Sequence, residues 1–152
     1  MKRTMALVAV VAVVGVLGVE AAGAAYGSGS SAAKVGTRHT SLGTVLVDAR
    51  GRTLYLFEKD KTKKSTCSGA CAANWPPVTT SGTPKASGGV NQHKLGTTKR
   101  SDGKTQVTYN GHPLYTFVID NNKPGSTKGE GVNAFGAKWY VMGTNGKKID
   151  DD

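Results

Sequence analysis

The sequence predicts a small, mostly β domain made of two tandem β-hairpin repeats, and three observations lead to this fold class. Residues 34–60 align with residues 94–120 without a gap, with eleven identities in twenty-seven positions. Apolar and polar residues alternate with the period of a β-strand in both copies. Beyond the first 24 residues, no segment of ten or more residues has the periodicity of an amphipathic helix.

The positions shared by the two copies include apolar, aromatic, glycine and charged residues. The identical pairs are Lys34/Lys94, Gly36/Gly96, Thr37/Thr97, Ser41/Ser101, Gly43/Gly103, Val47/Val107, Gly51/Gly111, Leu54/Leu114, Tyr55/Tyr115, Phe57/Phe117 and Asp60/Asp120. Because an isolated hairpin is only marginally stable in water, we expect the copies to pack together. The arrangements that we expect are one small antiparallel sheet, a sandwich or a barrel-like domain, with long loops.

The first 24 residues have the organisation of a secretory signal peptide. Lys2 and Arg3 precede an uncharged apolar run at Ala6–Val19, and Ala22-Gly23-Ala24 fits an A-x-A cleavage site. This run is shorter than the roughly 20 residues that span a bilayer, and an uncleaved anchor is the alternative. We therefore expect a secreted or cell-envelope-associated protein without a stable membrane span after processing, which begins with a flexible leader at residues 25–33.

The chain is strongly basic, with 20 Lys and Arg residues against 10 Asp and Glu residues and a net charge of +10. An excess of this size favours anionic partners, such as a cell-wall polymer or a membrane surface, through long-range attraction. The basic residues are spread out, and the only dense cluster is Lys59, Lys61, Lys63 and Lys64. A solvated surface that keeps a secreted protein soluble is the alternative interpretation, and we expect no specific nucleic-acid site.

Each copy is expected to form a strand, a turn and then two strands joined by a tight hairpin. In the first copy, Val45 and Val47 alternate with polar neighbours, and Arg50-Gly51 supplies the turn. In the second copy, Asn110-Gly111 is the dipeptide preferred where both central turn residues need positive φ. Pro113 follows this turn and predicts an edge position or a strand start, because proline cannot donate to a β-ladder.

The domain is expected to span residues 34–143, with the repeats at 34–78 and 94–142. A polar connector rich in turn-forming residues occupies residues 79–93. The only helix that we expect is a single turn near residues 68–74, and a short strand is expected at residues 138–142. Residues 144–152 are expected to be frayed.

The most specific motif is Tyr-x-Phe-x-x-Asp, which occurs once in each copy. Its residues are Tyr55, Phe57, Asp60, Tyr115, Phe117 and Asp120. In a strand the tyrosine and the phenylalanine share a face, and the aspartate follows where the strand ends. There the carboxylate can accept backbone N–H groups or the tyrosine hydroxyl. The structural interpretation, with aromatic residues in the core, is favoured over a ligand-lining role because buried tyrosines need a polar partner.

With this doubled motif the chain resembles the bacterial secreted-repeat lipoprotein family, whose biochemical function is not established. The resemblance covers residues 34 to about 143, and it includes Cys67-Ser68-Gly69-Ala70-Cys71, Trp75-Pro76-Pro77 and Trp139-Tyr140-Val141. Many relatives are lipid-anchored, whereas this chain has no cysteine before Cys67. The resemblance implies an exported β protein and supplies no catalytic residue.

Cys67 and Cys71 are the only cysteines, and a closely spaced pair in an exported protein favours a disulfide. The alternative is a metal-handling or redox site, in which both thiolates would need further ligands from His39, His93 or His112. We assign no cofactor and no metal from the sequence.

Trp75 and Trp139 follow the two hairpins at similar intervals, and they are expected to cover the two halves of the core. An exposed aromatic patch for stacking on glycans is the alternative. No Gly-x-Ser-x-Gly pattern occurs, and no catalytic residue is assigned. The sequence thus predicts a non-catalytic secreted or cell-envelope-associated protein with a binding or structural role at the cell surface. The alternative function is extracytoplasmic metal handling or redox chemistry at Cys67 and Cys71.

Overall fold

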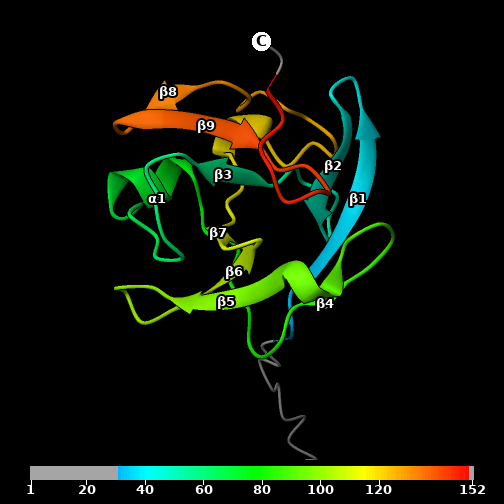
Figure 1. The fold of residues 1–152 in the computed structure, drawn as a ribbon. Helices are drawn as coiled ribbons and strands as arrows, with labels where there is room; N and C mark the ends of the chain where they lie inside the picture. The colour runs from blue at the N-terminus through cyan, green and yellow to red at the C-terminus, as the bar shows by residue number, and fades with distance from the viewer. Residues whose placement is uncertain (1–30, 151–152) are drawn as a thin grey trace, which may run out of the picture.

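The mostly β fold is confirmed, and its strands are divided among several small sheets. The computed structural model describes residues 31–150. Within these residues the strands form three three-stranded sheets, and no single continuous sheet or closed barrel is present (Figure 1). The signal peptide predicted at residues 1–24 and most of the predicted leader, residues 25–30, lie outside the described residues.

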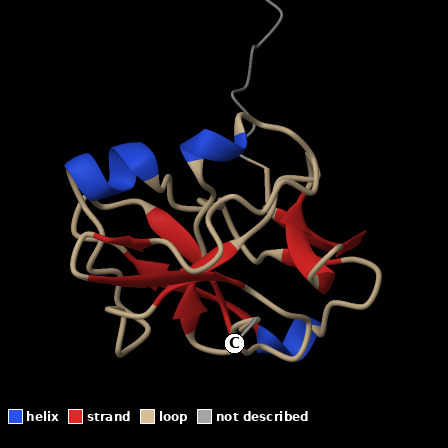
Figure 2. Cartoon of the chain, turned by 90° about the horizontal axis from the view of Figure 1, so that it is seen from above, coloured by secondary structure: helices blue, strands red, loops and turns tan. Residues whose placement is uncertain are grey.

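The elements are short, and three of the nine strands in residues 31–150 have only two residues. The strands are β1 (Lys34–Thr40), β2 (Gly43–Asp48), β3 (Tyr55–Phe57), β4 (Lys85–Ala86), β5 (Leu95–Lys99), β6 (Thr105–Tyr109), β7 (His112–Pro113), β8 (Asn133–Ala134) and β9 (Ala137–Val141). The helical elements are α1 (Ala70–Asn74), η1 (Gln92–Lys94) and η2 (Val118–Asp120). Figure 2 shows the strands crossing the middle of the molecule, with the short helices at its rim.

The antiparallel pairs β1–β2 and β5–β6 occupy equivalent positions in the two repeats. The tight hairpin predicted at Asn110-Gly111 joins β6 to β7, and both turn residues have positive φ, 50° and 79°. Pro113 lies in the edge strand β7, where its missing N–H group costs no ladder bond. The connector adds β4, which pairs in parallel with the start of β1.

The sheet that contains β3 and β9 joins the two repeats into one body. Strand β3 of the first repeat pairs antiparallel with β9 of the second, so that Tyr55 faces Val141 and Phe57 faces Trp139. Tyr55 and Tyr115 also exchange two backbone hydrogen bonds, with N···O distances of 2.8 and 3.0 Å. The repeats therefore share an interior, as the duplication predicts.

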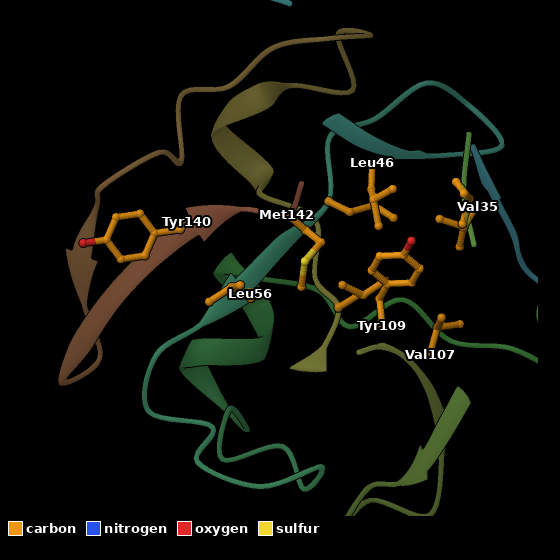
Figure 3. Packing of buried hydrophobic residues seen from close by; sticks show 10 residues of the cluster. Val35, Leu46, Leu56, Val107, Tyr109, Tyr140 and Met142 are labelled. Atoms are coloured by element: carbon orange, nitrogen blue, oxygen red, sulfur yellow. The ribbon is translucent and has the colours of Figure 1, made fainter. Parts of the chain in front are cut away.

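The core consists of two clusters, and each draws residues from both repeats. The first cluster contains Val35, Leu46, Leu54, Leu56, Val90, Val107, Tyr109, Leu114, Tyr140 and Met142 (Figure 3). The second contains Val45, Val47, Tyr55, Phe57, Cys67, Cys71, Trp75, Tyr115, Trp139 and Val141. Neither half of the chain can therefore bury its apolar residues without the other half.

The C-terminal segment differs from the expectation that residues 144–152 are frayed. Gly143 N donates to Lys147 O, and Ile149 N donates to Val141 O, each at 2.9 Å. Ile149 packs against the second core cluster, and this apolar contact was not evident from the charged sequence around it. The segment is thus attached to the core as far as Ile149, and residues 151–152 lie outside the described part. None of the helices in residues 31–150 is long and apolar enough to span a membrane.

Candidate functional site

Each motif tyrosine donates its hydroxyl hydrogen bond to the aspartate of the other repeat. Tyr55 Oη lies 2.6 Å from Asp120 Oδ2, and Tyr115 Oη lies 2.6 Å from Asp60 Oδ2. All four residues are buried. The two copies of the motif are therefore linked by an exchange of partners across the boundary between the repeats.

The second oxygen of each aspartate holds the loop that follows it. Asp60 Oδ1 accepts bonds from the backbone N and the hydroxyl of Thr66, both at 2.7 Å. Asp120 Oδ1 accepts from the hydroxyl of Ser126 at 2.8 Å and from the N of Lys128 at 3.0 Å. Both carboxylates thus accept hydrogen bonds from donors within the protein. Few of their acceptor sites are left for a ligand.

The tyrosine hydroxyls are held in their neutral form. Burial is the largest cause that raises the pKa of both Tyr55 and Tyr115 far above the ordinary value. The neighbouring carboxylates, Asp120 and Asp60, act in the same direction because a phenolate beside them would be repelled. These phenols are suited to a lasting structural hydrogen bond and not to proton transfer near neutral pH.

Four aromatic rings form a continuous stack through the centre, in the order Phe117, Trp75, Trp139 and Phe57. Successive ring centroids are 3.8, 4.0 and 4.0 Å apart, and the interplanar angles are 13°, 2° and 6°. Each phenylalanine stacks on the tryptophan of the other repeat. Trp75 and Trp139 are 1% and 0% exposed, so the alternative of an exposed patch for stacking on glycans is wrong.

Arg100 is a buried charged residue that was not selected from the sequence. Its counterpart in the first copy is Thr40, so the alignment of the repeats carries no signal for it. Its Nη1 donates to Ser65 Oγ at 2.9 Å and to Gln106 Oε1 at 2.8 Å, and its Nη2 donates to Cys67 O at 2.8 Å. Since the hydroxyl of Ser65 lies 2.7 Å from that of Tyr115, Arg100 ties the cysteine loop to the central motif.

Cys67 and Cys71 form the predicted disulfide, and both residues are buried. The bond leaves neither sulfur as the free thiolate that the metal-handling alternative requires. The three histidines lie on different elements: His39 is near Thr44, His93 lies in η1 at the end of the connector, and His112 lies beside the first motif. Burial lowers the pKa of His112. In residues 31–150, no three His, Cys, Asp or Glu side chains are grouped so as to hold a metal ion.

A basic hollow, which we call the first groove, lies over β1 and β2. Its volume is about 620 Å³, and its walls include the turn at residues 49–51 and the connector residues Ser87 and Gly88. Three cationic side chains line it, Lys34, Arg38 and Arg50, and all are exposed. Within the described residues, no ion pair engages any of the three.

Asp48, the only acidic residue that lines the first groove among residues 31–150, is already paired with an arginine. Asp48 Oδ2 lies 2.6 Å from Arg52 Nη2 and 2.7 Å from Arg52 Nε, while its Oδ1 accepts the N of Arg50 and of Arg52. The groove therefore presents an excess of positive charge, since Arg52 does not line it.

A second hollow, which we call the second groove, lies over β5 and β6. Its volume is about 510 Å³, and its walls include the Asn110-Gly111 turn and the end of the connector. Its basic side chains are Lys63 and Lys94, with His93 beside them. The lysine cluster is evident in the sequence, but neither groove is, because each groove is formed by segments that are distant in the chain.

Comparison with known protein families gives one match. A family described as a secreted repeat of unknown function matches residues 36–79 and 96–142, more than half of the chain. The two matched segments coincide closely with the repeats seen in the sequence. Searches among curated proteins and among solved structures found no match.

Proposed function

The chain belongs to the family of secreted repeats of unknown function, and from this premise we propose that it is a non-catalytic binding protein for an anionic polymer at the cell surface. The observation that carries the proposal is the first groove, where Lys34, Arg38 and Arg50 are exposed and have no ion-pair partner among the described residues. Cationic side chains around a hollow attract a polyanion, and guanidinium groups match phosphate or carboxylate oxygens in pairs.

The core supports this function by holding the groove in shape. The exchanged tyrosine–aspartate bonds and the aromatic stack fix the two repeats relative to each other. A groove that is formed before binding loses less conformational entropy when the ligand arrives. The disulfide suits an oxidising, extracellular compartment, in agreement with the family description.

The proposal is tested by co-sedimentation of the purified exported chain with an insoluble anionic cell-wall polymer. We expect binding at low ionic strength that weakens steadily as salt is added, because screening shortens the range of the attraction. An insoluble neutral glycan is the matched control and should retain none of the protein. Anionic lipid vesicles in a parallel series show whether a membrane surface is the better ligand.

Absence of binding to the polymer at low salt, or equal binding to the neutral glycan, would contradict the proposal. Preferential binding to vesicles would contradict the polymer as the partner.

A further inference from the structure

The two grooves have equivalent positions in the two repeats, and we propose that they are two ligand sites for the same chain of repeated anionic groups. This inference rests on the proposed function and adds the number and place of the sites. The first groove is lined by Lys34, Gly36, Thr37 and Gly51, and the second by the residues sixty positions later, Lys94, Gly96, Thr97 and Gly111.

These four pairs are identical in both copies, although the core does not require them all. Most of the other identities are explained by burial, since the copies share the aromatic and aliphatic residues of the interior. Burial does not explain why a lysine occurs at both positions, because Lys34 is exposed and Lys94 is only half-buried. Neither lysine belongs to an ion pair in the described part of the chain. A shared ligand accounts for a shared cationic side chain at the rim of each groove.

The floors of the grooves are also alike, since each has a glycine beside a hydroxyl group. A Cβ atom at Gly36 would lie 3.0 Å from Ser87 Oγ, and one at Gly96 would lie 3.0 Å from Thr108 Oγ1. Neither glycine has the positive φ that would demand glycine for backbone reasons. Because these glycines have no side chains, hydroxyl and backbone groups line each groove together with its lysine. This combination suits phosphate or carboxylate groups on a polyol or sugar chain.

The two sites are unequal in charge. Arg38 and Arg50 of the first groove correspond to Thr98 and Asn110 in the second copy. Lys63 compensates in part, because the loop after β3 brings it to the second groove. We therefore expect the first groove to bind more tightly than the second.

One polymer can reach both sites, because the connector borders both grooves. Gly88 lines the first groove and Asn91 lines the second. Three residues of chain span at most about 11 Å, so these borders are close together. A polymer long enough to occupy both grooves gains affinity, since its second contact is made within the complex.

The experiment is isothermal titration of the exported chain with tripolyphosphate, followed by long-chain polyphosphate and polygalacturonate. The long polymers distinguish a phosphate source from a carboxylate source. Three double variants carry the same loss of charge. They are Lys34→Gln/Arg50→Gln in the first groove, Lys63→Gln/Lys94→Gln in the second, and Lys104→Gln/Lys138→Gln outside both as the matched control.

For tripolyphosphate we expect two sites on the natural chain and on the control, and one site on each groove variant. A preferred long polymer should bind the natural chain at least about tenfold more tightly than either groove variant, because each variant loses the bridging contact. Circular dichroism of each variant checks that the fold is retained.

A single site on the natural chain, or equal weakening in all three variants, overturns the two-site inference. The proposed function survives that result as long as polymer binding persists. If the natural chain binds no anionic polymer, both the inference and the proposed function fail.

Discussion

Tyr55 and Asp120 are 65 positions apart in sequence, and their side chains form a buried hydrogen bond of 2.6 Å. Asp60, which belongs to the same copy of the motif as Tyr55, is instead bonded to Tyr115. The motif is therefore a means of joining two repeats, and its residues do not act together within one repeat. This exchange makes the stability of either half depend on the other.

Double-mutant cycles test the exchange directly. Tyr55→Phe should lower the free energy of unfolding by about 1.5–3 kcal/mol, because a hydrogen bond to a charged group is lost. Its effect should be coupled to that of Asp120→Asn and additive with that of Asp60→Asn. Urea unfolding of the single and double variants measures the coupling energy of Tyr55 with each aspartate.

Tyr140→Phe is the matched control for this cycle, because Tyr140 is buried but its hydroxyl has no hydrogen bond among the described residues. We expect it to change stability by less than about 0.5 kcal/mol. Coupling of Tyr55 with Asp60 in place of Asp120 would show that the exchange is absent in solution.

Alkaline titration should show the two central tyrosines as a separate class. Because their pKa is raised in the folded state, the folded protein holds these protons more tightly than the unfolded chain does. Stability is then unaffected by them below about pH 10 and falls above it, by up to about 1.4 kcal/mol per pH unit for each tyrosine. Phenolate absorbance, recorded together with circular dichroism, should show that Tyr55 and Tyr115 ionise only as the chain unfolds. Their ionisation near pH 10 in a still-folded protein would contradict the buried bonds.

Replacement of Arg100 should be among the most destabilising single substitutions outside the aromatic core. Arg100→Gln leaves the buried acceptor Gln106 Oε1 without the Arg100 donor and Cys67 O with only the 3.4 Å bond from Ser65 Oγ, at a cost of about 2–4 kcal/mol in unfolding free energy. Lys104→Gln removes an exposed charge nearby and should have almost no effect. Chemical denaturation of both variants makes the comparison, and equal stabilities would show that the buried network contributes little.

The disulfide should resist reduction in the native protein. Cys67 and Cys71 are 1% and 6% exposed, so a thiol reagent has poor access to either sulfur. We expect thiol titration to find no free thiols before denaturation and two after denaturation with reductant. The double variant Cys67→Ser/Cys71→Ser should lose only about 2 kcal/mol, since the closed loop is short. Two reactive thiols in the native exported protein would restore the metal or redox alternative.

The first repeat should not fold alone. Residues 25–89 contain β3 and Trp75 but lack β9, Asp120 and the rings of Phe117 and Trp139. We expect no cooperative thermal transition for this fragment, and recovery of one when residues 90–152 are added. A melt of the isolated fragment equal to that of the whole chain would contradict the shared core.

The sequence was informative wherever a local pattern decides the outcome. Alternation predicted the strands, Asn110-Gly111 predicted a tight turn, and the spacing of Cys67 and Cys71 predicted their bond. It could not show which aspartate each tyrosine contacts, because an alignment of repeats identifies equivalent positions and not neighbours in space. Arg100 was missed for a related reason, since it has no charged counterpart in the first copy.

The division into three sheets and the existence of the grooves were equally hidden. The grooves depend on where the connector lies, since β4 pairs with β1 and Gly88 lies against Thr37 of that strand. The attachment of the C-terminal segment depends on Ile149, a single apolar residue among charged ones. Such long-range contacts leave no periodic trace in a single sequence.

The reciprocal exchange of Tyr55 and Tyr115 has the symmetry of an isologous homodimer, in which each surface meets its own copy. A polypeptide with only one of these units would leave its half of the aromatic stack without the rings that cover it. Because both units belong to one chain here, their association does not depend on protein concentration.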